Sequence, residues 1–174
     1  IWTALSPMNT PRSDHGVVSA QGKLFAVGGL SPNDQGENEL LKSVECFDPS
    51  TGVWTNINPM NEARGELGVA VLGDKLFAVG GRNNFPNGFG EEACLSSVEC
   101  LDLSVPSSPW TTMPPMIKPR GYGMGAVTGG KIFVAGGNEE GSIECFDPSD
   151  GPAGRWTVIS EPSEFGTGAA GSAC

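Results

Sequence analysis

The residues best suited to acid–base and metal chemistry are scarce in this sequence. His15 is the single histidine and Tyr122 the single tyrosine. One histidine cannot supply the multi-histidine ligand set of a typical zinc site, and it leaves little acid–base chemistry near neutral pH. The five cysteines include no C-x-x-C pair. We therefore assign no catalytic residue, no metal site and no cofactor, and we expect a protein that is not an enzyme.

The charge of the chain limits the partners that it can bind. Ten Lys and Arg against 20 Asp and Glu give a formal net charge of −10 over 174 residues. A nucleic-acid-binding protein normally carries a basic patch, and an anionic membrane surface repels an acidic chain, so we expect neither partner. No run reaches the roughly 18 apolar residues of a membrane-spanning helix. The odd number of cysteines favours a reducing compartment, and we expect a cytoplasmic protein.

The residues that recur with a fixed spacing are more informative. The run K-L-F-A-V-G-G, or its variant K-I-F-V-A-G-G, occurs at 23–29, 75–81 and 131–137. A Pro-Met pair precedes each run, with an arginine five residues after the proline, and an E-C-[FL]-D element and a tryptophan follow it. The repeat period is about 50 residues. The positions in register are Arg12, Arg64 and Arg120; Glu45, Glu99 and Glu144; Cys46, Cys100 and Cys145; and Trp54, Trp110 and Trp156.

Short β-strands must position these residues. The segments G-V-V-S-A-Q, K-L-F-A-V-G-G, S-V-E-C-F-D and W-T-N-I-N are short and rich in β-branched or alternating apolar residues. Glycine and proline interrupt every longer window, so no helical period is sustained. Four strands at a period near 50 residues are typical of one blade of a β-propeller.

With these motifs the sequence resembles the Kelch-repeat family, in particular the propeller of Kelch-like proteins that carry BTB and BACK domains. The resemblance implies an all-β, Kelch-type β-propeller over 1–174, with repeats at approximately 7–57, 59–113 and 115–160. Residues 1–5 match a tryptophan-led fourth strand, and 161–174 match the start of a fourth repeat. Propellers close with about 4–8 blades. Three complete four-stranded blades therefore predict a fragment of a propeller with six blades in all, or a homodimer of two three-bladed halves.

The repeated residues are expected to be structural. The glycine pairs allow strands to meet where a Cβ would clash, or allow a positive φ. The tryptophans fill the space between neighbouring blades. Each arginine ties a loop to a neighbouring backbone or carboxylate, with Glu45, Glu99 and Glu144 as candidate partners. The repeated cysteines are expected to be small buried hydrophobes.

Recognition is expected where the repeats differ, which is in two sets of loops. One set follows the glycine pairs (30–42, 82–96 and 138–142), and the other follows the repeated arginines. Both sets join strands at the same end of an up-and-down blade. In Kelch propellers that end often binds the partner, and the resemblance implies the same here, although such residues are also common in solvated loops. The candidate contacts are Asp14, Glu66, Tyr122, Asp34, Arg82, Asn83, Asn84, Phe85, Asn138 and Glu139.

The resemblance implies a non-enzymatic protein-interaction module, acting as the substrate-recognition propeller of a cullin-3 ubiquitin ligase adaptor. An actin- or cytoskeleton-binding role is also known in the family and uses the same face. A different alternative is an enzyme similar to galactose oxidase or to a sialic-acid mutarotase. Copper oxidase chemistry of that kind requires two histidines and a tyrosine cross-linked to cysteine, and His15 and Tyr122 alone do not provide them. A purely structural spacer would tolerate any change in the loops.

Overall fold

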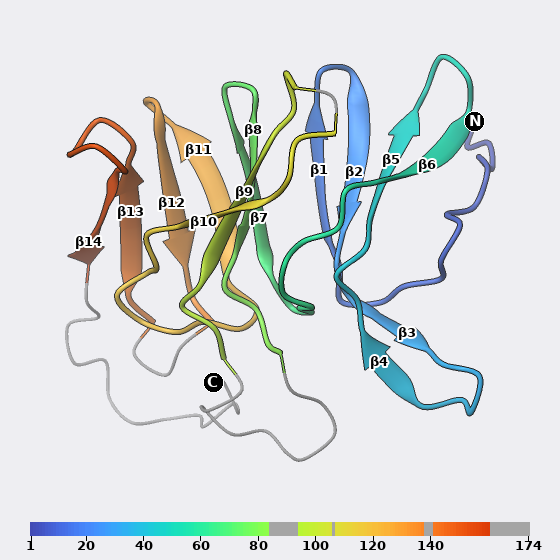
Figure 1. Ribbon diagram of the computed structural model, residues 1–174, viewed down its shortest axis with the longest axis horizontal. Helices are drawn as coiled ribbons and strands as arrows, with labels where there is room; N and C mark the ends of the chain where they lie inside the picture. Colours follow the sequence, from blue (N-terminus) through green and yellow to red (C-terminus); the bar gives the residue numbers. More distant parts are fainter. Residues whose placement is uncertain (84–93, 106, 138–140, 161–174) are drawn as a thin grey trace.

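The computed structural model describes residues 1–83, 94–105, 107–137 and 141–160. Their regular secondary structure is entirely β, with three four-stranded antiparallel sheets and one two-stranded hairpin. The three sheets stand side by side in chain order and do not close into a ring (Figure 1). We call them blade 1, blade 2 and blade 3. The prediction of an incomplete all-β propeller with three four-stranded blades is confirmed.

Each blade is an up-and-down meander. Blade 1 contains β1 (Gly16–Ala20), β2 (Lys23–Val27), β5 (Val44–Asp48) and β6 (Val53–Ile57). Blade 2 contains β7 (Gly68–Leu72), β8 (Lys75–Val79), β9 (Val98–Asp102) and β10 (Thr111–Met113). Blade 3 contains β11 (Met124–Thr128), β12 (Lys131–Ala135), β13 (Ile143–Asp147) and β14 (Arg155–Ser160). The first strands β1, β7 and β11 lie next to one another, so they form the inner edge of the partial ring.

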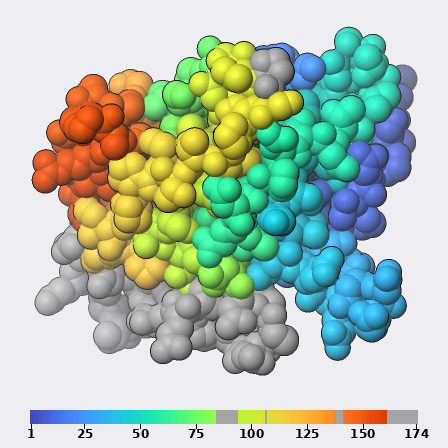
Figure 2. Space-filling model, viewed as in Figure 1, coloured from blue at the N-terminus to red at the C-terminus, as the bar shows by residue number. Residues whose placement is uncertain are grey.

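Two segments differ from the expected strand pattern. The segment 30–42, predicted as a loop, contains the hairpin of β3 (Leu30–Pro32) and β4 (Asn38–Leu40), which projects below blade 1 in Figures 1 and 2. Residues 1–8 form no strand, although a fourth strand was expected at 1–5. In each blade the outer strand pairs with the E-C-[FL]-D strand before it, and residues 1–5 pair with none of the described strands. The expected fourth repeat at 161–174 lies outside the described residues.

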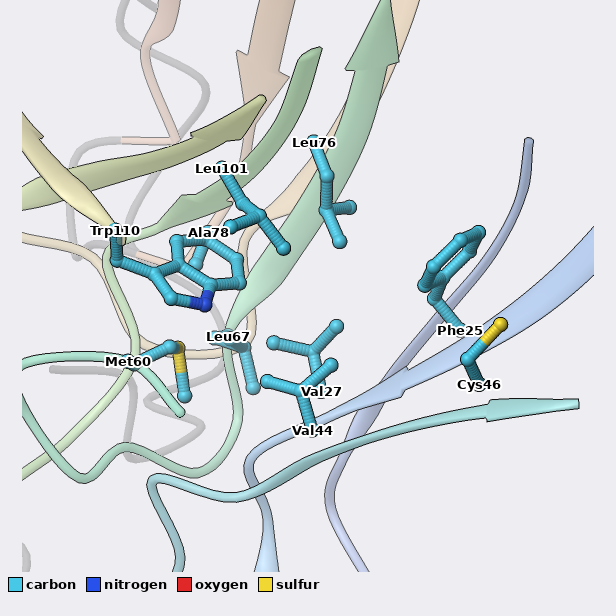
Figure 3. Packing of buried hydrophobic residues seen from close by; sticks show 10 residues of the cluster. All are labelled: Phe25, Val27, Val44, Cys46, Met60, Leu67, Leu76, Ala78, Leu101 and Trp110. Atoms are coloured by element: carbon cyan, nitrogen blue, oxygen red, sulfur yellow. The ribbon is translucent and has the colours of Figure 1, made fainter. Parts of the chain in front are cut away.

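The alternation of side chains along each strand gives every blade two apolar faces. Phe25 and Cys46 lie on the face of blade 1 that meets blade 2, where they share a cluster with Leu76, Leu101 and Trp110 from the facing side of blade 2 (Figure 3). An equivalent cluster lies between blades 2 and 3, around the tryptophan of blade 3. Trp110 and Trp156 therefore fill the space between blades, and Cys46 and Cys100 are buried there, as predicted. Cys145 is also buried, whereas Trp54 is half-buried and belongs to neither cluster.

Each tryptophan also binds the chain segment that leads into its blade. The indole Nε1–H of Trp110 donates to the carbonyl oxygen of Asn58 at 2.8 Å, and that of Trp156 donates to the carbonyl oxygen of Pro114 at 3.0 Å. In blade 1 the indole of Trp54 donates to the carbonyl oxygen of Ser6 at 3.0 Å. The segment before β1 thus holds the position that the connections between blades hold further along the chain.

The glycine pairs are the points where neighbouring blades join through their backbones. The N–H of Gly81 donates to the carbonyl oxygen of Arg120 in blade 3 at 2.7 Å. A Cβ on Gly80 would lie 2.5 Å from that same oxygen, which is too close for any side chain. Gly80 and Gly81 also have φ values of +59° and +91°. Both predicted reasons for the glycines, close approach and positive φ, are therefore confirmed.

Candidate functional site

The two sets of variable loops lie at one end of the blades, as the up-and-down order predicts. Isolated bridges pair Ser13 with Leu30 and Gly65 with Arg82, which in the first two repeats places the residue after the repeated arginine against the residue after the glycine pair. In blade 3 the N–H of Gly121 donates to the carbonyl oxygen of Gly137 at 3.0 Å. We call this end, with residues 13–15, 30–42, 65–67, 82–83 and 121–123, the loop face; it is at the bottom of Figure 1.

Three of the predicted contact residues form a continuous backbone ladder across this face. The N–H of Glu66 donates to the carbonyl oxygen of Asp14 at 2.8 Å, and the N–H of Tyr122 donates to the carbonyl oxygen of Glu66 at 2.7 Å. All three residues have a positive φ, of 51°, 53° and 53° in chain order. This conformation is unfavourable for any residue with a Cβ, so the ladder stores backbone strain at one equivalent position in every blade. We call these three residues the rim.

Side chains link the rim to the loop that follows the second glycine pair. Glu66 is buried, and its carboxylate accepts a hydrogen bond from the Tyr122 hydroxyl. That bond, together with burial and the negative charge of Glu66, raises the pKa of Tyr122 to about 12. Arg82 is also buried, with its Nη1 3.7 Å from the Glu66 Oε2. The phenol ring of Tyr122 remains exposed.

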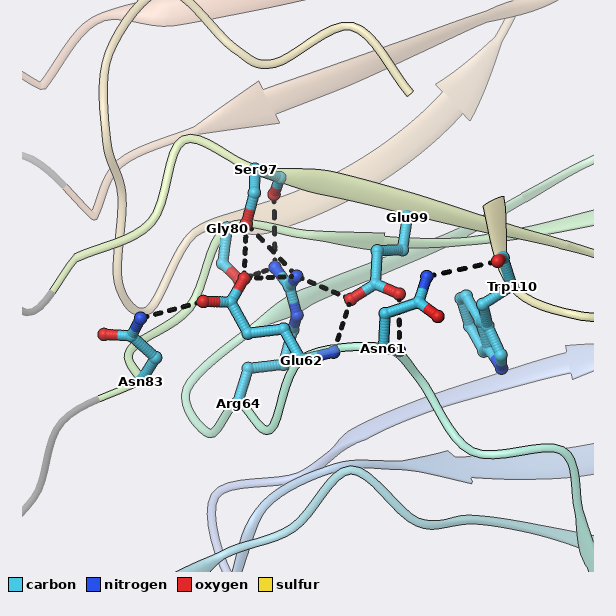
Figure 4. A network of polar contacts seen from close by, with 8 residues as sticks. All are labelled: Asn61, Glu62, Arg64, Gly80, Asn83, Ser97, Glu99 and Trp110. Carbon is cyan, nitrogen blue, oxygen red and sulfur yellow. Dashed lines mark hydrogen bonds and ion pairs between the residues drawn. The ribbon is translucent and has the colours of Figure 1, made fainter. Parts of the chain in front are cut away.

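The repeated arginines hold the loop face in place. Arg64 is fully buried, and its guanidinium donates to the carbonyl oxygens of Gly80 and Ser97 at 2.8 and 3.1 Å (Figure 4). Its Nη2 also donates to the Ser97 hydroxyl at 3.1 Å and to the Glu99 carboxylate at 2.8 Å. Equivalent contacts join Arg12 to Glu45 and Arg120 to Glu144. The predicted link between a loop, a backbone and a carboxylate is confirmed in each blade.

The repeated glutamates secure the same loops from the other side. The Glu99 carboxylate accepts the backbone N–H groups of Asn61 and Glu62 at 2.7 and 3.1 Å. In blade 3 the Glu144 carboxylate accepts the N–H groups of Ile117 and Lys118 in the same way. A buried charged pair that also satisfies backbone donors has few conformational alternatives. The loops that carry the rim therefore rest on a rigid support.

Glu62 connects this support to the surface and was not found by sequence reasoning. Its Oε2 accepts from Arg64 Nη2 at 3.1 Å and from the Ser97 hydroxyl at 2.9 Å. Its Oε1 accepts from the Asn83 side-chain amide at 2.8 Å, which positions a predicted contact residue (Figure 4). The equivalent positions are Thr10 and Lys118, so no repeat pattern marks Glu62.

The predicted contact residues other than Tyr122 divide into three groups. Asp14, Asp34 and Asn83 are exposed, with Asp34 in the turn between β3 and β4. Glu66 and Arg82 are buried behind the rim, so they support exposed neighbours and present little surface themselves. Four more lie outside the described residues, namely Asn84, Phe85, Asn138 and Glu139.

The repeated cysteines are not a reactive cluster. Cys46, Cys100 and Cys145 are buried free thiols in three different blades. Burial raises the pKa of each thiol, that of Cys100 to about 11, which disfavours the nucleophilic thiolate. Within the described ranges no three His, Cys, Asp or Glu side chains gather so as to hold a metal ion. The same ranges contain no helix that could cross a membrane.

The fold and the repeated contacts define a propeller, and comparison with known proteins gives its family. The sequence profile described as Kelch motif matches residues 11–61 and 63–117, which together are more than half of the chain. The chain belongs to the Kelch-repeat family. The third blade repeats the same arginine, glutamate and tryptophan contacts outside the matched residues.

Individual relatives agree with this assignment. The chain is 41% identical over 83 residues to Kelch-like protein 28 of Mus musculus, a match that covers 46% of this chain and 14% of that protein. It is 43% identical over 79 residues to the Influenza virus NS1A-binding protein homolog of Xenopus laevis, covering 45% of this chain and 12% of that protein. The solved structure of YjhT superposes with a TM-score of 0.79 at 18% identity, covering 94% of this chain and 56% of YjhT, and shows the same fold.

Proposed function

We propose that this chain is a protein-interaction module that binds its partner through the loop face and performs no catalysis. The observation that carries the proposal is the rim. Asp14, Glu66 and Tyr122 occupy one equivalent position in three blades, with the same strained backbone and three different side chains. Strained positions cluster at functional sites, and loops on a rigid scaffold commonly carry recognition.

The choice of residues at the rim supports this proposal. Glycine would adopt a φ near +50° without strain. The chain uses glycine at many turns of this kind, including Gly22, Gly52 and Gly73 at the opposite end of the blades. At the rim the chain has aspartate, glutamate and tyrosine instead. The side chains at these positions therefore have a function that offsets the free-energy cost of the backbone strain. Recognition of a partner is such a function.

The proposed contacts follow from exposure. Tyr122, Asp14, Asn83 and Asp34 present side chains to solvent. Tyrosine is enriched in protein interfaces because its ring is large and its hydroxyl is polar. The exposed acids favour a partner segment with basic or polar groups. Asn84 and Phe85, which follow Asn83 in the sequence, and Asn138 and Glu139, which follow the third glycine pair, stay in the proposal.

We extend the proposal to a whole-protein role, as the substrate-recognition propeller of a cullin-3 ubiquitin ligase adaptor in the cytoplasm. Its support is similarity to Kelch-like proteins, of which this chain spans only a small part, 14% in the case of Kelch-like protein 28. A second support is a relative that is itself named as a protein-binding protein. A cytoskeletal protein as the captured partner is the other outcome of the test that follows.

The test compares three forms of the chain in affinity capture followed by quantitative mass spectrometry. The first is the wild type. The second carries Asp14→Ala, Asn83→Ala and Tyr122→Ala on the loop face. The matched control carries Thr51→Ala, Asp74→Ala and Asp150→Ala, which change exposed turn residues at the opposite end. We expect a set of proteins retained by the wild type and the control and lost by the loop-face variant. The same proteins on all three forms would contradict the proposal.

A further inference from the structure

A pocket opens between blades 2 and 3 at the end of the blades opposite the loop face, which is at the top of Figure 1. We call this end the turn end, because the tight turns that join β1 to β2, β7 to β8 and β11 to β12 lie there. The pocket has a volume of about 490 Å³, which is within the range of small-molecule sites. The equivalent space between blades 1 and 2 is much smaller, at about 190 Å³.

Two hydrogen bonds close the space between blades 1 and 2 at the turn end. The Gln21 side-chain amide donates to the Asp74 carboxylate at 3.0 Å, which joins the first turn of blade 1 to the first turn of blade 2. The Asn58 side-chain amide donates to the carbonyl oxygen of Ser108 at 2.8 Å. Gln21, Asn58 and Ser108 line the smaller pocket, so these bonds hold its walls together.

The equivalent residues between blades 2 and 3 cannot make these bonds. Gly73 and Gly130 hold the turn positions that Gln21 and Asp74 hold one blade earlier, and neither glycine has a side chain. Pro114 holds the position of Asn58, since the carbonyl oxygen of each accepts a tryptophan indole, and its side chain has no donor. The larger pocket is therefore a consequence of three differences between neighbouring repeats.

Apolar side chains from both blades line the larger pocket. Phe77 of blade 2 and Phe146 of blade 3 are buried, with ring centroids 6.1 Å apart and ring planes at 54°. Leu72 and Met113 also line the pocket and are half-buried. Ring–ring and sulfur–ring contacts add to the free energy gained by burying apolar area, so this lining favours an aromatic ligand.

The charges that line the two pockets differ. Lys23 and Asp102, which are of opposite sign, line the smaller pocket. The described residues that line the larger pocket include one charged side chain, Lys75. Its Nζ donates to the Asp102 Oδ2 at 3.1 Å, and this bond raises the pKa of Lys75, so the ammonium form is present at neutral pH. An ammonium group has three donors, and Asp102 uses one of them, which leaves donors for the carboxylate of a ligand.

We propose that the pocket between blades 2 and 3 binds a small aromatic monocarboxylate. The aromatic ring lies against Phe77, Met113 and Phe146, and the carboxylate accepts hydrogen bonds from Lys75, whose side chain is 53% exposed. A cationic ligand fits less well, because Lys75 repels it. This site and the loop face are at opposite ends of the blades, so the chain can hold a small molecule and a partner protein at the same time.

The first measurement is a calorimetric titration of the full chain with 2-naphthoate, an aromatic monocarboxylate, and with 2-naphthamide, a neutral probe of the same shape. We expect saturable binding of both probes. Lys75→Gln should weaken the binding of naphthoate about fivefold, which is the effect of one exposed ion pair, and should leave the affinity for naphthamide unchanged.

Lys23→Gln is the matched control for this charge. Lys23 has the same position in blade 1, pairs with Asp48 at 3.1 Å and lines the smaller pocket. Its replacement should leave the affinities for both probes unchanged. An equal loss of naphthoate binding in Lys23→Gln and Lys75→Gln would overturn the proposal.

The second measurement locates the site by filling it. Ala153 is exposed and lines the pocket, so Ala153→Trp should weaken the binding of both probes at least about tenfold. The control Thr51→Trp adds the same side chain to the corresponding exposed turn of blade 1 and should have no effect. Circular dichroism checks that each variant is folded. Unchanged binding in Ala153→Trp, or a folded wild-type chain that shows no saturable binding, would also overturn the proposal.

Discussion

The backbone N–H of Tyr122 donates a 2.7 Å hydrogen bond to the carbonyl oxygen of Glu66, and Glu66 makes the same contact with Asp14 one blade earlier. The Tyr122 hydroxyl returns to the Glu66 carboxylate, so these two residues are joined through both backbone and side chain. Glu66 is buried and Tyr122 is exposed. The buried acid therefore determines how the exposed ring of the rim is presented.

The titration of Tyr122 tests this contact directly. Its hydroxyl must keep its proton to donate to Glu66, so the pKa is raised to about 12. Because the chain has a single tyrosine, the ultraviolet signal of tyrosinate reports this group alone. We expect a midpoint near 12 in the wild type and a midpoint closer to the ordinary value of 10.0 in Glu66→Gln. An equal midpoint in both proteins would show that Glu66 is not the cause.

Removal of a repeated arginine should destabilise the whole chain. Arg64→Ala leaves the buried carboxylate of Glu99 without its 2.8 Å partner and leaves the carbonyl oxygens of Gly80 and Ser97 without donors. Breaking a buried ion pair on one side typically costs about 3–5 kcal/mol, and we expect a loss of that size in the free energy of unfolding in urea. Arg155→Ala is the control, because its pair with Asp150 is exposed and spans 3.8 Å. It should cost less than about 1 kcal/mol.

The glycines at the joints between blades should tolerate alanine poorly. A Cβ on Gly81 would lie 2.6 Å from the carbonyl oxygen of Gly65, and its φ is +91°. Gly73 has a φ of +60° and open space within 4 Å of the position a Cβ would take, so Gly73→Ala carries only the backbone strain of about 1–2 kcal/mol. Gly81→Ala should lower the free energy of unfolding by a further 1–3 kcal/mol or so, because backbone must move. Equal losses of free energy in Gly81→Ala and Gly73→Ala would mean that the backbone around Gly81 accommodates the added Cβ without a further energetic cost.

The stability of the chain should fall as the pH is lowered through the range where His15 titrates. Burial, and then the positive charge of Arg12, lower the pKa of His15 below its ordinary 6.5. The unfolded chain then binds a proton that the folded chain does not, so the stabilisation is present above about pH 6.5 and is lost as the pH falls below it. Urea unfolding at pH values from roughly 7 to 5.5 should show this loss in the wild type. His15→Gln should show a flatter profile over the same range, and an unchanged slope would assign the effect to another group.

The repeat pattern predicted most of the scaffold. Arginine, glutamate, glycine and tryptophan recur in register, and each meets the kind of partner that its chemistry requires, for example Arg64 with Glu99 and Trp110 with the neighbouring blade. This succeeded because a blade is a local unit whose strands follow one another along the chain, so sequence spacing fixes most contacts within it. The hairpin of β3 and β4 was missed because the sequence of its segment, 30–42, differs from the sequences of the equivalent segments 82–96 and 138–142.

The sequence by itself determined the strands, their alternation and therefore which side chains each blade presents on its two faces. Only the tertiary structure decided that Glu66 and Arg82 are buried behind the rim and that Glu62 reaches Asn83. Those contacts join loops from different strands and blades, and no spacing along the chain encodes the distance between them.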